Sequence, residues 1–234
     1  MSAVLKEAVV PASATPARYN IYNVIHKALR AFMADTLLKV GRMDVTDDGE
    51  RGETIAQLRG LLARCTSHLQ HENGFVHPAL EQARRGGAAL TTADHEHHQL
   101  AIAGLQGEAA RFEAAAAERR PLLAKTLYLS LSAFVAGNFT HMITEEVGNH
   151  ATLIEAFDEA EVLALEQRLV ASLSAEEKFA AMSWMIPHIN ASERAFLLGG
   201  MKRHAPREVF EAVLGLARDS LSQRDFYKLE RALA

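Results

Sequence analysis

The 234-residue sequence is short of the residues on which several common kinds of site depend. It contains one cysteine, Cys65, which excludes an intramolecular disulfide framework and a thiolate-rich zinc or iron–sulfur site. Low cysteine usage also favours a reducing compartment, so we expect a cytoplasmic protein. The net charge of −4 gives no basic excess, and we expect no nucleic-acid partner. Glycine patterns of phosphate loops, nucleophile elbows and dinucleotide-binding turns are absent from the sequence.

A secretory signal and a convincing membrane span are lacking as well. Residues 1–16 have no long apolar run after a basic start, and we expect them to form a flexible arm. The longest stretch without acidic or basic side chains, residues 126–144, just reaches the length of a span but holds Ser130, Asn138 and His141. We expect this stretch to be a helix buried in a soluble bundle, and we expect no membrane partner.

What the sequence has in abundance is alanine, leucine, glutamate and arginine, and alternating β-branched runs are absent. This composition predicts an all-α fold. Four long helices are predicted at about residues 17–40, 51–76, 92–117 and 121–157, with Thr92 as an N-cap and Pro121 in a first turn. Short helices follow, so we expect a bundle domain over residues 17–157 and a helical extension over residues 158–234. We expect the extension to pack on the bundle or to form a homodimer interface.

The pattern within residues 158–234 predicts a capping box at Ser174, a helix that ends before Pro187 and another that ends at Gly199 or Gly200. We expect these helices to share a small core of their own, which includes Phe179, Phe196 and Tyr227.

Each long segment carries an apolar stripe with steps of three and four residues, and a histidine interrupts every stripe. These histidines are His26, His68, His95 and His141. Residues at one height of an antiparallel hairpin lie equally far from its turn, and the midpoints between successive histidines fall in or beside the three predicted turns. The sequence therefore predicts an up-down-up-down four-helix bundle with the histidines in one layer. Glu72 and Glu145 follow His68 and His141 by four residues and share their faces.

Four imidazoles and two carboxylates form a donor set that suits iron, with manganese or zinc as substitutes. If both carboxylates bridge, the set is large enough for two ions. A ferritin-like site would need Glu-x-x-His on two helices, and this pattern is absent from the sequence. Five further residues are candidates for an extra ligand or a supporting group, although helix packing or a surface position is the alternative for most: His98, Glu146, His71, Asn138 and Tyr22.

Four motifs in the chain resemble those of the hemerythrin-like (HHE cation-binding) family over about residues 19–157. They are "HKALR" at His26, "HLQHE" from His68, "DHEHH" around His95 and "HMITEE" from His141. The resemblance implies a four-helix bundle with a non-haem di-iron centre and a small diatomic ligand, oxygen or nitric oxide. It implies a protein that binds or senses oxygen, nitric oxide or iron.

Two positions depart from the oxygen carriers of that family. The carriers have a second histidine four residues along the third helix, where this chain has Gln99. They have H-x-x-x-x-D on the fourth helix, where Glu145 and Glu146 are the candidates. These departures resemble the family's six-ligand regulatory branch. A di-iron enzyme acting on peroxide or another small oxidant, and a structural bundle without metal, stay open as alternatives.

Overall fold

Residues 19–234 are described by the computed structural model, and every regular element among them is a helix. The all-α prediction is therefore confirmed for this part of the chain. The expected arm at residues 1–16 and the expected start of the first long helix lie outside the described residues.

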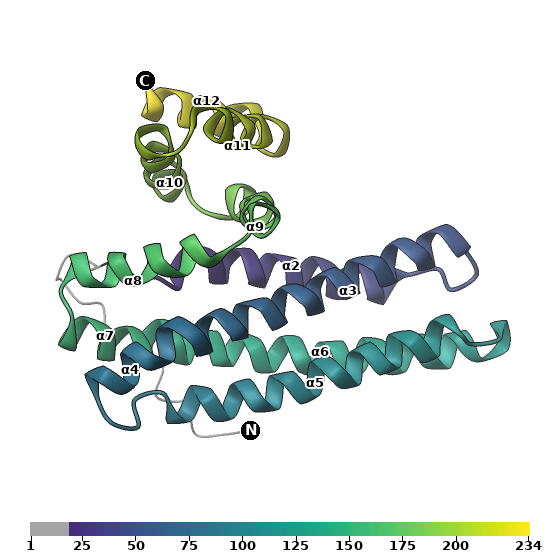
Figure 1. Ribbon diagram of the computed structural model, residues 1–234. Coiled ribbons are helices and arrows are strands. Elements are labelled where there is room, and N and C mark those ends of the chain that lie inside the picture. The colour runs from purple at the N-terminus through teal and green to yellow at the C-terminus, as the bar shows by residue number, and fades with distance from the viewer. Residues whose placement is uncertain (1–18) are drawn as a thin grey trace.

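Four long helical rods lie side by side (Figure 1). The first is α2 (Asn23–Arg42), and the third is α5 (Ala89–Glu113). The second joins α3 (Asp48–His71), the π-helix η1 (Glu72–Val76) and α4 (His77–Ala83). The fourth joins the 3-10 turn η2 (Ala117–Arg119), α6 (Arg120–Thr144), the π-helix η3 (Glu145–Asn149) and α7 (His150–Ala156). α2 packs on α3 and α6, and α5 packs on the same two helices, so each rod has two neighbours.

Helix ends differ from the prediction in two places. The second rod does not stop near residue 76, because Pro78 lies in the first turn of α4, where its missing N–H costs little. The third rod begins at Ala89 instead of using Thr92 as its N-cap. The Thr92 hydroxyl is hydrogen-bonded to His77 Nδ1 at 3.2 Å. Pro121 does lie in the first turn of α6, as predicted.

Two apolar clusters fill the rods and leave a polar layer between them. The larger cluster includes Leu58, Leu61, Leu127 and Leu131, all fully buried. The smaller lies at the other end and includes Tyr22, Val76, Leu80, Leu153 and Leu165. Because the second and fourth rods carry polar residues between their contributions to the two clusters, the chain buries a band of histidine and glutamate in its interior.

The chain continues in short helices, α8 (Glu159–Ser172), α9 (Ala175–His188), α10 (Ala191–His204), α11 (Arg207–Ser220) and α12 (Gln223–Leu233). α8, α9 and α10 each begin with a capping box, which includes the predicted one at Ser174. α9 packs on α2, where Trp184 stacks on Phe32 with ring centroids 4.2 Å apart. In Figure 1, α10, α11 and α12 lie together beyond α9, on one side of the rods.

The interior of these short helices differs from the prediction. Their own core consists of Ile186, Leu198, Val213, Ala217 and Leu229. Phe179, Phe196 and Tyr227, which were expected in it, are 49%, 64% and 60% exposed. α9 continues through Pro187, and α10 continues past the glycines expected to end it. The proposed domain division and the homodimer through these helices stay predictions.

By length and composition alone, the rod Ala117–Ala156 could cross a membrane. Leu122, Leu129 and Ile143 on its exposed side contribute to this hydropathy. A core helix of a soluble protein passes the same test, so the finding is weak evidence. The expectation of a cytoplasmic protein without a membrane partner stays a prediction.

Candidate metal centre

Each of the four rods supplies one of the predicted histidines to a single buried cluster. His26 comes from α2, His68 from α3, His95 from α5 and His141 from α6. Glu72 and Glu145 are the first residues of the two π-helices, and both are buried beside the imidazoles. The structure thus brings together all six residues that the sequence selected.

The six side chains divide into two groups that share both carboxylates. One group is His26, His68, Glu72 and Glu145, and the other is Glu72, His95, His141 and Glu145. Within each group the candidate ligand atoms lie within 4.8 Å of one another.

The carboxylate of Glu72 lies between the two groups. Its Oε1 is 3.2 Å from His68 Nε2, and its Oε2 is 3.5 Å from His95 Nε2. Glu145 has a similar place, with Oε2 3.2 Å from His141 Nε2 and Oε1 3.5 Å from His95 Nε2. Ligand atoms in a coordination shell with bonds of about 2.1 Å are separated by roughly 3 Å, so these spacings approach those of two shells sharing two carboxylates.

Hydrogen bonds on the outer side of three imidazoles fix which nitrogen faces the cluster. His26 Nδ1 donates to Glu146 Oε1 at 3.0 Å, and His95 Nδ1 donates to Asn73 Oδ1 at 2.7 Å. His141 Nδ1 donates to Asp94 Oδ2 at 3.2 Å. With Nδ1 as the donor, each Nε2 points its lone pair inward, which is the arrangement of histidines that bind metals.

The inward-facing atoms find few partners within the protein. Among the described residues, Nε2 of His26, Nε2 of His68 and all four carboxylate oxygens of Glu72 and Glu145 are buried without a hydrogen bond. Nε2 of His95 and Nε2 of His141 face each other at 3.1 Å. An unsatisfied buried polar atom costs about 1–3 kcal/mol, and this cluster of them could hold a metal ion.

Burial also changes the protonation of the cluster. It raises the pKa of Glu72 to about 8, with a further contribution from the charge of Glu145. It raises the pKa of Glu145 well above its usual range, and it lowers the pKa of His95 to about 4 and that of His141 to about 2. The metal-free cluster therefore holds neutral imidazoles beside carboxyl groups that resist ionisation.

His26 is the exception among the imidazoles. Its burial lowers the pKa, but the hydrogen bond to Glu146 and the nearby carboxyl group of Glu72, 3.6 Å from Nε2, outweigh burial and raise the pKa. Glu146 also accepts a hydrogen bond from Arg30 at 2.5 Å, so its carboxylate is held on the outer side of His26. Glu146 thus lies in a supporting position, whereas Glu145 points into the cluster.

The other four candidates lie around the cluster. His98 is buried, with its ring 4.8 Å from that of His141, but it belongs to neither ligand group. Asn138 donates to the carbonyl of Phe134, which favours the packing interpretation. The Tyr22 hydroxyl accepts a hydrogen bond from the side-chain amide of Asn149. His71 Nδ1 is 3.3 Å from Ser67 Oγ.

Sequence reasoning selected neither Asn73 nor Asp94, and His77 was not among its candidates. His77 stacks on His95 with ring centroids 4.7 Å apart and is hydrogen-bonded to Thr91 and Thr92. The sequence does hold a pattern that could have pointed to His77, because H-x3-E-x4-H occurs both at 68–77 and at 141–150. In both copies the glutamate begins a π-helix, a distortion that occurs frequently at functional sites.

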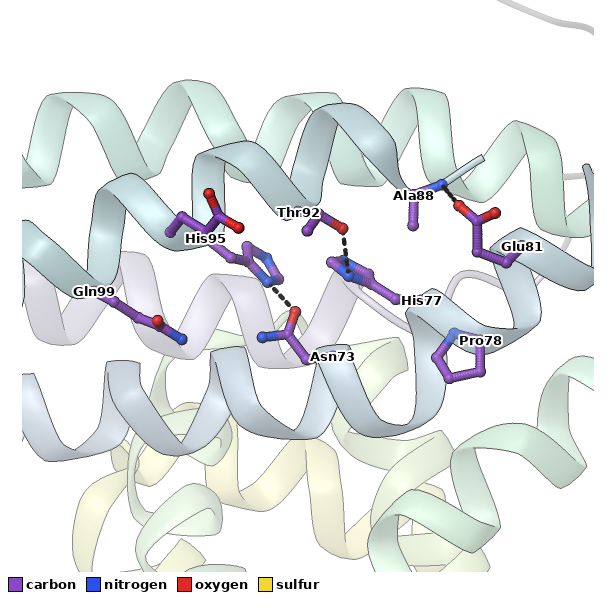
Figure 2. Close-up of a pocket in the computed structure, with 9 residues that line it drawn as sticks. Asn73, His77, Pro78, Glu81, Ala88, Thr92, His95 and Gln99 are labelled. Atoms are coloured by element: carbon purple, nitrogen blue, oxygen red, sulfur yellow. Dashed lines mark hydrogen bonds between the residues drawn. The ribbon is translucent and has the colours of Figure 1, made fainter. Parts of the chain in front are cut away.

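Two cavities reach the cluster from different sides. One, of about 510 Å³, is lined by Asn73, His77 and His95 (Figure 2). Figure 2 shows the hydrogen bond between His95 and Asn73, with the hydrogen bond between Thr92 and His77 beside it. The other cavity, of about 890 Å³, has His68 and Glu72 in its wall.

No family model matches this chain, and neither do the curated proteins or the solved structures with which it was compared.

Proposed function

We propose that this chain is a non-haem metal protein of the hemerythrin type that holds two iron ions and binds or senses oxygen, nitric oxide or iron. The observation that carries the proposal is the pair of carboxylates, Glu72 and Glu145, each shared between two groups of imidazoles and left without hydrogen bonds among the described residues. The closed ring of contacts among α2, α3, α5 and α6 supports a four-helix bundle around this layer.

The residues present fit a pair of metal ions. His26 and His68 would hold one ion, His95 and His141 the other, and Glu72 and Glu145 would bridge both. Bound there, two irons would supply open coordination positions and redox chemistry for a diatomic ligand. Imidazole nitrogen with carboxylate oxygen suits iron, and manganese or zinc could replace it.

The chain's own residues have two roles in this proposal. Glu146, Asn73 and Asp94 hold the imidazole rings through Nδ1. The apolar clusters at both ends of the layer keep bulk water away. Gln99, which replaces a carrier ligand of the resembled family, is exposed and lines the smaller cavity. This position supports sensing over oxygen transport.

Iron reconstitution tests the proposal. We expect close to two irons per chain in the full-length protein, with visible bands that change on titration with oxygen or nitric oxide. Glu72→Ala and Glu145→Ala should each abolish these bands, and Glu146→Ala should leave them nearly intact. A protein that takes up no metal after reconstitution would contradict the proposal, and a content near one would indicate a mononuclear site.

The same samples test the alternative of a di-iron enzyme acting on peroxide. Catalytic consumption of peroxide by the iron-loaded protein, lost in Glu72→Ala, would favour the enzyme. An exchange of phenotypes between Glu145→Ala and Glu146→Ala would assign the fourth-rod ligand to Glu146 instead.

A further inference from the structure

The larger cavity lies between the rods and the short helices that follow them. Its walls on the rod side include Ile21, Val24 and Val76, and on the other side Leu169, Met182 and Leu197. The last three residues belong to α8, α9 and α10, so the cavity exists only because these helices fold back onto α2 and α3.

Its volume of about 890 Å³ lies in the range of cavities that bind small organic molecules, roughly 300–1,000 Å³. A diatomic molecule needs only a small fraction of this space. Most of the wall surface is apolar, and polar side chains supply the rest. An apolar surface with polar groups that fix orientation is the usual composition of an organic ligand site.

The charged groups that line the cavity are mostly acidic. Glu166, Glu177 and Glu193 contribute carboxylates, of which Glu193 is paired with Lys27, and Arg64 contributes the single guanidinium in the lining. Several of these carboxyl groups are held in place, since Tyr19 donates to Glu166 at 2.5 Å and Asn23 donates to Glu193 at 2.7 Å. This balance opposes the entry of an anion and tolerates a neutral or cationic group.

The cavity also touches the candidate metal centre. His68, whose side chain is 15% exposed, and Glu72 both line it. The other three ligand histidines are more deeply buried, and a molecule in this cavity would cover the side of the cluster that His68 and Glu72 present.

We propose that the cavity binds an apolar organic molecule whose polar end is neutral or cationic, beside His68 and Glu72. The position beside a metal centre rests on the proposed function, whereas the binding itself depends only on the cavity. A bound molecule would control access of other solutes to the cluster through His68.

Three ligands of equal chain length test the charge argument: dodecanol below its solubility limit, and dodecylamine and dodecanoate below their micelle concentrations. Binding to the full-length metal-free protein is measured by displacement of the fluorescent probe N-phenyl-1-naphthylamine. We expect dodecanol and dodecylamine to bind at least tenfold more tightly than dodecanoate. Glu166→Gln keeps an acceptor for Tyr19 and should reduce the discrimination against dodecanoate. Equal affinities, or preference for dodecanoate, would overturn the charge argument.

Two matched substitutions locate the binding. Leu169→Trp and Met182→Trp should fill part of the cavity and weaken dodecanol binding at least tenfold. Leu100→Trp on α5, at a position that is 74% exposed and outside the cavity, should change it less than twofold. Far-UV circular dichroism establishes that each variant is folded. Folded cavity variants that bind as well as Leu100→Trp would overturn the proposal.

Iron-loaded protein tests the link to the cluster. Dodecanol at saturation should slow iron removal by a chelator at least fivefold in the unsubstituted protein and not in Leu169→Trp. Ligand binding without iron uptake would contradict the proposed function and leave the cavity proposal standing. Iron uptake without binding of any of the three ligands would contradict the cavity proposal and leave the proposed function standing.

Discussion

Replacing Glu72 with glutamine should have opposite effects on stability with and without metal. In the metal-free protein, burial and the charge of Glu145 raise the pKa of this carboxyl from 4.5 to about 8. The folded state therefore binds the extra proton between these values. The folded state is therefore most stable below pH 4.5, and it loses stability as the pH rises from 4.5 to about 8.

The difference in pKa sets the magnitude. At pH 7 the unfolded chain has released the proton and the folded chain still holds it, which costs about 3 kcal/mol of unfolding free energy. At pH 5 the same cost is under about 1 kcal/mol. Glutamine cannot ionise, so Glu72→Gln should stabilise the metal-free protein by up to about 3 kcal/mol at pH 7 and by little at pH 5.

With iron bound, the sign should reverse. At a free iron concentration of one thousand times the Kd, which is needed to exceed the gain of about 3 kcal/mol from glutamine, a ligand that binds only the folded state adds about 4.1 kcal/mol. Because glutamine cannot supply a bridging carboxylate, the variant should lose most of this gain. Urea unfolding at pH 5 and pH 7, with chelator and with iron, measures all four values.

Glu108→Gln is the matched control. Glu108 lies on α5 outside both ligand groups and accepts a hydrogen bond from Ser130 at 2.9 Å. This variant should show no dependence on metal. The reasoning would be refuted if Glu72→Gln destabilised the metal-free protein at pH 7 as much as the iron-loaded one, because the carboxylate would then be a satisfied structural group.

Three further results are expected. Glu146→Gln should lower iron affinity 10- to 100-fold in chelator competition while two ions still bind at saturation, because His26 Nδ1 loses a charged acceptor. Iron affinity should rise between pH 6 and pH 8, because the metal displaces the proton that Glu72 holds up to about pH 8. Calorimetry in different buffers measures the protons released. An iron affinity that does not change with pH would contradict this. Leu61→Ala, at a fully buried core position, should cost about 2–5 kcal/mol of unfolding free energy while the folded protein keeps its iron content.

The sequence was informative about the layer because helical periodicity and hairpin geometry are simple constraints. Steps of three and four residues place His26 on the same face as Leu29 and Met33, and all three are buried. Equal distances from predicted turns place the four histidines at one height, and the structure brings them together.

Partners across the rods were beyond sequence reasoning. Asn73 and Asp94 hold His95 and His141 through contacts that depend on how each helix is rotated against its neighbour. The continuation of the second rod past Pro78 depends on the π-helix before it, and a helical pattern with a period of 3.6 residues does not indicate such a turn.

The amino-acid sequence by itself determined that the chain is helical, which faces of the long helices are apolar and which six side chains interrupt them. These properties depend on local periodicity. Only the tertiary structure decided that Phe196 and Tyr227 are exposed, that Glu146 faces away from the cluster and that α8, α9 and α10 enclose a cavity beside His68. Short capped helices satisfy their local rules wherever they pack, so their position follows from the surfaces they cover and not from their own pattern.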